Sequence, residues 1–251
     1  VSKMHGARND FIVVDARSQT LKDPIEFAQS LCNRRTGIGA DGVLLIGESV
    51  RADISMRIIN ADGSEAEMCG NGIRCVARYV DEYSQRDALR VETSAGLIET
   101  LVVRRGKTYS VRVNMGIPEI LNLDVLGNSA VVSVGNPHFV YFADSLESVD
   151  LVAYGERMQR DPAFPRGVNV HIAVVESGAN ALQMRHYERG VGLTMACGTG
   201  AVAAAAAAIE RGAARSPIDV SVPGGELVVE WDGRGAAFMT GPAVHVFDTV
   251  V

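Results

Sequence analysis

Cys197 stands directly before a glycine-rich turn and a long uncharged segment. It precedes Gly198-Thr199-Gly200, and the nine residues 201–209 carry no charge. This segment predicts a helix that is buried on every side, because it is apolar all round and alanine is the best helix former. Cys197 would then lie at the helix N-terminus, where free N–H groups attract anions and the helix dipole lowers the pKa of a thiol. A buried structural cysteine is the alternative for this segment alone.

A second copy of the arrangement lies earlier in the chain. Cys69 precedes Gly70-Asn71-Gly72, and an apolar helical face follows with the spacing i, i+3, i+4, i+7: Ile73, Val76, Ala77 and Val80. Two cysteines that each open a helix behind a Gly-x-Gly turn favour a chemical role over a structural one.

Two thiols at helix N-termini suit the inversion of a carbon stereocentre. A thiolate removes a proton from one face of the carbon, and a thiol donates a proton to the other face. The sequence contains no apparent pyridoxal-lysine motif and no metal-ligand cluster. N–H donors at the helix N-termini would therefore stabilise the charge that grows on a substrate carboxylate, each by roughly 3 kcal/mol. The pattern predicts two-thiol acid/base catalysis without a cofactor or a metal.

The two cysteine motifs belong to a longer internal repeat. Cys197 minus Cys69 is 128, and three further pairs of polar residues recur at offsets of 127 or 128: Asn9/Asn136, Asp41/Asn169 and Asn60/Glu188. A constant offset between like elements indicates a duplicated domain. We therefore expect two similar α/β halves related by a pseudo-two-fold axis, with these polar residues gathered around the cysteines.

Hydrophobic patterning divides each half into short strands and helices. Helices are expected at 24–35 and 148–158 in addition to the two that follow the cysteines. Strands are expected at 11–14, 43–46, 56–60, 89–93, 97–103, 109–115, 131–134, 139–142, 170–175, 181–187, 218–222, 226–231, 236–239 and 243–250. Glycine-proline crossings at 115–118 and 241–242 predict an N-terminal domain of residues 1–115 and 242–251, and a C-terminal domain of residues 116–241.

Composition excludes several classes of protein. The 251 residues are 47% hydrophobic, which suffices for real cores, and the net charge is −6 without runs of Lys or Arg. We therefore expect neither nucleic acid nor a membrane as a partner. Four cysteines without C-x-x-C spacing predict no disulfide framework and no zinc knuckle. With no signal-peptide pattern at the N-terminus, the expected location is the cytoplasm.

The chain resembles the diaminopimelate epimerase family nearly from end to end. The resemblance rests on both cysteine motifs and on the segments 3–6, 9–11, 37–41, 60–64, 135–138, 167–170 and 187–190. It implies a cofactor-independent enzyme that interconverts LL- and meso-2,6-diaminopimelate in lysine and peptidoglycan-precursor synthesis. It also implies two pseudo-symmetric domains, each a mixed, mostly antiparallel sheet curled around a central helix, and a homodimer.

The resemblance also implies roles for individual residues. Cys69 and Cys197 would be the acid/base pair, written as donor and acceptor, with His138 and Glu188 in support. The reacting end of the substrate would be held by Asn9, Gly70, Asn71, Asn136, Gly198 and Thr199, and the distal end by Asn60, Asn169, Glu188 and Arg189. Arg189 suits a bidentate grip on the distal carboxylate.

Two departures from the family pattern leave the substrate open. Gly42 stands where many members carry Gln, and Leu193 stands where many carry Glu. A racemase or epimerase of another amino acid, such as histidine, is the first alternative. A non-catalytic amino-acid-binding protein is the second alternative, although binding alone would not need two thiols.

Overall fold

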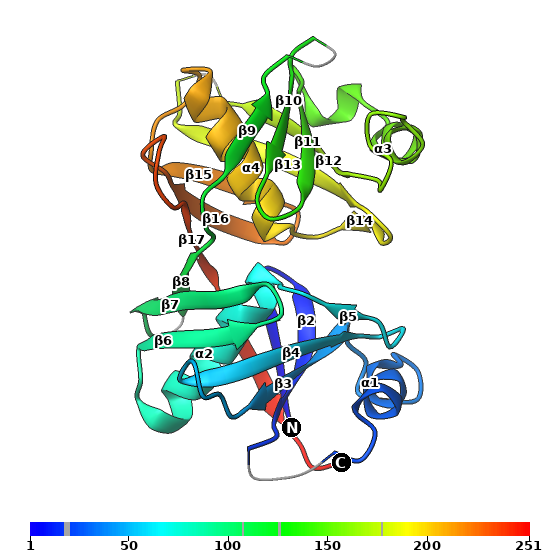
Figure 1. The fold of residues 1–251 in the computed structure, drawn as a ribbon, viewed down its shortest axis with the longest axis vertical. Helices are drawn as coiled ribbons and strands as arrows, with labels where there is room; N and C mark the ends of the chain where they lie inside the picture. Colours follow the sequence, from blue (N-terminus) through cyan, green and yellow to red (C-terminus); the bar gives the residue numbers. More distant parts are fainter. Residues whose placement is uncertain (18–20, 107, 125–126, 177) are drawn as a thin grey trace. The chain divides into compact units, whose positions relative to one another are not determined.

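The computed structural model describes residues 1–17, 21–106, 108–124, 127–176 and 178–251. These residues form two compact units. The first unit comprises residues 1–113 and 241–251, and the second comprises residues 114–240. Figure 1 shows the elements of each unit.

The first unit is a mixed sheet with two helices, α1 (Pro24–Cys32) and α2 (Gly70–Ser84). Neighbouring strands pair antiparallel except β2–β3 and β4–β6, which are parallel. The strands are β1 (Ser2–Gly6), β2 (Asn9–Asp15), β3 (Gly42–Gly47), β4 (Ile54–Asn60), β5 (Glu65–Ala66), β6 (Ala88–Thr93), β7 (Gly96–Arg104), β8 (Ser110–Asn114) and β18 (Val244–Asp248).

The second unit repeats this order of elements, with α3 (Leu151–Gln159) and α4 (Gly198–Glu210) in the places of α1 and α2. Its parallel pairs are β11–β12 and β13–β15, whereas β9–β10, β10–β11, β12–β13, β13–β14, β15–β16 and β16–β17 are antiparallel. Its other elements are β9 (Glu119–Asn122), β10 (Ser129–Ser133), β11 (Pro137–Phe142), the short 3-10 helix η1 (Leu146–Ser148), β12 (Asn169–Val175), β13 (Ala181–Glu188), β14 (Gly192–Thr194), β15 (Ile218–Val222), β16 (Gly225–Glu230) and β17 (Phe238–Pro242).

The two central helices are the ones that follow the cysteines. Helix α2 contacts β1, β2, β3, β4, β7 and β18, and α4 contacts β10, β11, β12, β13, β15 and β16. All residues from Ala201 to Ala208 are buried, as the uncharged run predicts. In Figure 1 the strands of each unit lie around its central helix. The expected mixed α/β fold, mostly antiparallel and curled around a central helix, is confirmed.

Helices α1 and α3 cover the outer faces of the sheets. Ala28 and Cys32 of α1 pack against Ile12, Val14 and Val43, and Leu151 and Met158 of α3 pack in the corresponding cluster with Phe139, Val170 and Ile172. Cys32 is therefore a core residue. Strands β3 and β12 are buried on both faces for most of their length, which explains the continuous apolar sequence of β3 and makes His171 of β12 a buried polar residue.

Some predicted boundaries were wrong. Helix α1 ends at Cys32 rather than at residue 35, because the next residue, Asn33, is extended and its side chain accepts the N–H groups of Arg35 and Thr36. Helix α3 begins at Leu151 rather than at residue 148, because Asp150 caps it. Strands β1, β5, β9 and β14 were not predicted, because they are short or carry polar residues.

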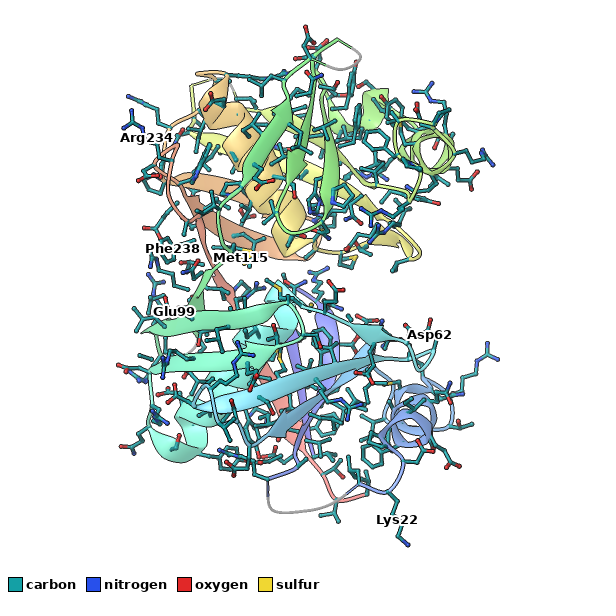
Figure 2. The ribbon with its side chains drawn as sticks, viewed as in Figure 1. Lys22, Asp62, Glu99, Met115, Arg234 and Phe238 are labelled. Carbon is teal, nitrogen blue, oxygen red and sulfur yellow. The ribbon has the colours of Figure 1, made fainter. Side chains whose placement is uncertain are left out.

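The first predicted crossing, 115–118, pairs with the chain shortly before the second one, 241–242. The N–H of Met115 donates to the carbonyl of Ala237 at 2.9 Å, and the N–H of Ala237 donates to the carbonyl of Gly116 at 2.8 Å. Met115 and Phe238 mark this place in Figure 2. None of the described helices is long and apolar enough to span a membrane.

Candidate functional site

Cys69 is the N-cap residue of α2. Its Sγ accepts the N–H of Gly72 at 3.4 Å, and the thiol donates to Asn9 Oδ1 at 3.6 Å. The side chain is half-buried, whereas Gly70, Asn71 and Gly72 are buried in the first turn of the helix. Free N–H groups at a helix N-terminus favour a negative charge, so this position can hold a thiolate or an anionic ligand.

A chain of hydrogen bonds fixes the amide groups around Cys69. Asn71 Nδ2 donates to Asn9 Oδ1 at 3.2 Å, and Asn9 Nδ2 donates to Asp41 Oδ2 at 2.7 Å. Asp41 Oδ1 in turn accepts from Arg34 at 2.8 Å. Asn9 therefore presents its carbonyl oxygen, not its amide nitrogen, to the thiol.

The fully buried Arg74 anchors the same group from inside the first unit. It donates to Asn71 Oδ1 at 2.8 Å and to the carbonyls of Gly70 and Pro242, each at 3.0 Å. Arg74 was not predicted from the sequence. The available signal was an arginine on the apolar face of a helix, three and four residues after Asn71 and Gly70.

Cys197 is the N-cap residue of α4 and is only 4% exposed. Its Sγ lies 3.6 Å from the hydroxyl of Thr199. Burial, followed by the negative charge of Glu188, raises the pKa of the Cys197 thiol well above its ordinary value. The expectation of a lowered pKa is wrong for Cys197, because desolvation and a neighbouring carboxylate outweigh the helix N-terminus. In this structure Cys197 is a protonated thiol at neutral pH.

Glu188 lies beside Cys197 and is suited to exchange a proton with it. Its Oε1 accepts the hydroxyl of Thr194 at 2.6 Å, and its side chain hydrogen-bonds that of Cys197. Burial raises the pKa of Glu188, and the two hydrogen bonds oppose that rise. A carboxylate with a raised pKa next to a thiol can take up the thiol proton.

His138 is the first of three buried histidines that form a hydrogen-bonded chain. Its Nε2 lies 2.7 Å from Asn136 Oδ1, and its Nδ1 lies 2.9 Å from His171 Nε2. His171 Nδ1 lies 3.0 Å from His186 Nδ1. Burial is the main cause that lowers the pKa of His138 and of His186 to about 3, and it also lowers the pKa of His171 well below its ordinary value. All three rings are neutral at pH 7.

His171 and His186 were missed because no motif contains them. They are direct partners across β12 and β13. Three of the five histidines of the chain lie in one half, two of them on its predicted strands 170–175 and 181–187, and this concentration was the available signal. A nitrogen of His138, a nitrogen of His171 and Cys197 Sγ lie within 4.8 Å of one another, although no metal site was expected.

The residues predicted for the distal end of the substrate lie at the ends of strands or directly after one. Asn60 Nδ2 donates to Ser64 at 2.9 Å within the turn that follows β4. Asn169 Oδ1 accepts the backbone N–H of Arg189 at 3.0 Å, and Asn169 Nδ2 donates to the carbonyl of Pro137 at 3.3 Å. The exposed Arg189 side chain donates to the carbonyl of Arg166 at 3.1 Å. The end of β13 thus links Cys197 to Asn169. Glu188, its last residue, hydrogen-bonds Cys197, and the next residue, Arg189, donates its backbone N–H to Asn169.

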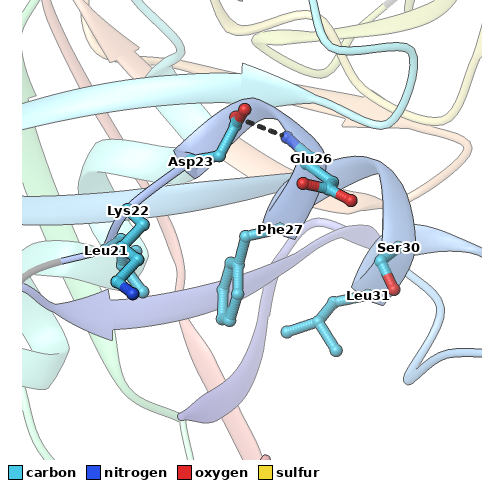
Figure 3. A pocket seen from close by; sticks show the side chains of 7 residues that line it. All are labelled: Leu21, Lys22, Asp23, Glu26, Phe27, Ser30 and Leu31. Carbon is cyan, nitrogen blue, oxygen red and sulfur yellow. Dashed lines mark hydrogen bonds between the residues drawn. The ribbon is translucent and has the colours of Figure 1, made fainter.

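A surface pocket on the first unit is separate from these residues. It lies along α1 and is lined by residues such as Asp23, Phe27 and Leu31 (Figure 3). Asp23 is the N-cap residue of α1, and its carboxylate accepts the N–H groups of Ile25 and Glu26. None of the predicted site residues lines this pocket.

Solved structures share this fold. A phenazine biosynthesis protein of the PhzF family from Bacillus anthracis matches with a TM-score of 0.76 at 16% identity, covering 100% of this chain and 98% of the other. A probable proline racemase from Agrobacterium radiobacter matches with a TM-score of 0.70 at 20% identity, covering 100% and 92%. At these identities the likeness concerns the fold.

Sequence comparisons identify the family. The family model described as diaminopimelate epimerase matches residues 1–121 and 130–246. The diaminopimelate epimerase of Carboxydothermus hydrogenoformans is 44% identical over an alignment of 268 positions, gaps included, which covers 98% of this chain and 96% of the relative. The diaminopimelate epimerase of Desulfitobacterium hafniense is 40% identical over an alignment of 276 positions, gaps included, which covers 100% of this chain and 97% of the relative. The chain therefore belongs to the diaminopimelate epimerase family and is an isomerase.

Proposed function

We propose that this protein interconverts LL- and meso-2,6-diaminopimelate with Cys69 and Cys197 as its two acid/base residues. The observation that carries the proposal is the pair of cysteines at equivalent N-cap positions, each on the central helix of one unit. Membership of the diaminopimelate epimerase family supports diaminopimelate as the substrate. The reaction serves lysine and peptidoglycan-precursor synthesis in the cytoplasm, and the enzyme acts as a homodimer of two-domain subunits.

Inversion needs one thiolate and one thiol, which exchange states in each turnover. The thiolate takes the α-proton, the electron pair of the broken C–H bond spreads into the substrate carboxylate, and the opposite thiol returns a proton to carbon. N–H groups at the starts of α2 and α4 stabilise the charge on the carboxylate. Glu188 accepts the proton of Cys197 when Cys197 must act as the base, and His138 supports the acid/base pair. The reaction proceeds without pyridoxal phosphate or a metal.

The remaining predicted residues hold the substrate. Gly70, Asn71, Gly198 and Thr199 bind the reacting end together with Asn9 and Asn136, because they place N–H and amide groups at the two helix N-termini. The distal end carries an ammonium and a carboxylate, for which Glu188 and Arg189 are the charged partners. Asn60 and Asn169 shape the turns that carry this end of the site.

Solvent isotope exchange tests the proposal. In deuterated water, LL-diaminopimelate should gain deuterium at one α-carbon while the meso isomer appears. Cys69→Ala and Cys197→Ala should each abolish epimerisation and leave the circular dichroism spectrum unchanged. Near-normal epimerisation by either variant would overturn the two-thiol mechanism. Turnover of L-proline or L-histidine without turnover of diaminopimelate would overturn the assignment of diaminopimelate as the substrate.

A further inference from the structure

Three metal-ligating side chains of the second unit converge beside the N-terminus of α4. These are His138, His171 and Cys197, whose ligand atoms lie within 4.8 Å of one another. The two histidines are fully buried, and Cys197 is nearly so. Imidazole and thiolate are the ligands that zinc takes in proteins, whereas magnesium and calcium prefer oxygen. The donor set matches a cation of the zinc class.

Both imidazoles are oriented by partners at their far nitrogens. The Nε2 of His138 faces Asn136 Oδ1, which accepts, so Nε2 carries the ring proton and Nδ1 keeps its lone pair. The Nδ1 of His171 faces His186 Nδ1. Metal-bound histidines commonly donate their other N–H to such a partner, which fixes the ring orientation. The partners of a metal site are therefore already in place.

Charge also suits a bound dication. Gly200 has no side chain, so the His171 ring can lie close against the first turn of α4. Glu188 hydrogen-bonds the Cys197 side chain, so a thiolate and a carboxylate together balance the two positive charges. Buried charge is tolerated where it is compensated in this way. Zinc–nitrogen bonds of about 2 Å require the two facing nitrogens, now 2.9 Å apart, to separate to about 3.3 Å.

Binding exchanges one hydrogen bond and releases one proton. Before binding, His171 Nε2–H donates to His138 Nδ1, and His186 Nδ1–H donates to His171 Nδ1. When the cation takes His138 Nδ1 and His171 Nε2, the His171 proton moves to Nδ1 and the His186 proton moves to Nε2. That last nitrogen is buried and has no hydrogen-bond partner among the described residues. The rings keep three protons, and the Cys197 thiol loses its proton.

We propose that His138, His171 and Cys197 bind a divalent cation of the zinc class, and that the bound cation inhibits the enzyme by holding the Cys197 sulfur. The inhibition rests on the proposed function of Cys197, whereas the binding does not.

The first unit supplies an internal control. At the repeat offset of 128, His138 corresponds to Asp10 and His171 to Val43, and Val43 pairs with Ile59 where His171 pairs with His186. Cys69 thus shares the helix N-cap position of Cys197 but not the imidazoles. His171→Val gives the second unit the residue of the first.

Cobalt(II) is the probe, because a cobalt–thiolate bond gives a charge-transfer absorption band. The reduced protein should show this band at one equivalent of cobalt(II), and zinc should remove it. Cys197→Ser should lose the charge-transfer band. Cys69→Ser makes the same exchange of sulfur for oxygen and should keep both the band and the affinity for cobalt(II). His171→Val should weaken binding at least about tenfold. Absence of the band in the reduced protein, its survival in Cys197→Ser or its loss in Cys69→Ser would overturn the site.

Turnover tests the second half of the proposal. Zinc should inhibit epimerisation over the same concentrations at which it displaces cobalt(II), and a chelator should restore the activity. Full activity with the site occupied by zinc would overturn the inhibition. A protein that shows the band but has no epimerase activity without metal would overturn the proposed function and leave the cation site standing.

Discussion

The ring of His171 occupies the space in front of Gly200. A Cβ on Gly200 would lie 2.3 Å from Cε1 and 2.7 Å from Nε2 of His171. Both residues are fully enclosed, since Gly200 is in the buried first turn of α4 and His171 has no exposed surface. Glycine at this position therefore keeps the histidine chain against the helix that carries Cys197.

Gly200→Ala should destabilise the protein although alanine favours helices. The helix preference gains about 1 kcal/mol, but displacing a buried ring held at both nitrogens costs about 1–3 kcal/mol or more, so we expect a net loss of about 1 kcal/mol. The control is Gly72→Ala at the same place in α2, where the new Cβ meets a flexible methyl group of Leu44 at 3.0 Å. Thermal denaturation compares the two variants. Equal midpoints would contradict the fit between His171 and Gly200.

Local sequence predicted the central helices well because their signals are local. Which sides of the helices are buried is indicated by the charge-free run 201–209 and by the apolar face from Ile73 to Val80. The Gly-x-Gly turns indicate where each helix begins. The short strands β5 and β14 carry no such pattern. They form because β4 and β13 offer them backbone partners, which no window of sequence reveals.

The site was harder to predict than the fold because its chemistry depends on neighbours from other elements. The position of Cys197 at a helix N-terminus was predicted correctly. The direction of the shift in its thiol pKa was predicted wrongly, because the burial of the thiol and the contact with Glu188 arise only in the folded unit. His171 and His186 meet across two strands, and Arg74 reaches the carbonyl of Pro242. Their roles come from tertiary structure.

Glu188→Gln should lower the pKa of the Cys197 thiol. Burial raises that pKa first and the Glu188 charge raises it further, so removal of the charge favours the thiolate. The pH midpoint of Cys197 alkylation, followed by peptide mass spectrometry, should move to lower pH. Glu156→Gln, which removes an exposed carboxylate of the same unit, should leave the midpoint in place. An unchanged or higher midpoint in Glu188→Gln would rule out this electrostatic coupling.

The buried histidines should make the protein less stable as the pH falls from 6.5 toward 3. Their folded pKa values are lowered to about 3 for His138 and His186, and well below the ordinary value for His171, so the unfolded chain binds more protons in this window. Each histidine adds about 1 kcal/mol of lost stability per pH unit. Asp10, with its pKa lowered to about 2, contributes only below about pH 4. Unfolding free energies between pH 7 and 5 should fall accordingly.

His186→Leu isolates one of these protons. It removes a titrating ring that has an unpartnered nitrogen among the described residues, so the pH slope of stability should decrease by about one proton. The comparison uses slopes rather than absolute stabilities, because the substitution also changes packing. A slope equal to that of the unmodified protein would mean that His186 is already protonated in the folded state.

Asp41→Asn should reduce epimerase activity by freeing the amide of Asn9. Asp41 accepts from Asn9 Nδ2 and from Arg34, which aims Asn9 Oδ1 at the Cys69 thiol. An asparagine cannot accept both donors with one orientation of its amide, so the Asn9 amide can turn and present its nitrogen to the thiol. We expect about a tenfold loss of kcat/KM, by analogy with partners that orient catalytic ligands. Asp87→Asn, an exposed carboxylate of the same unit, is the matched control and should keep full activity. If both variants retain full activity, Asn9 does not depend on Asp41 for its orientation.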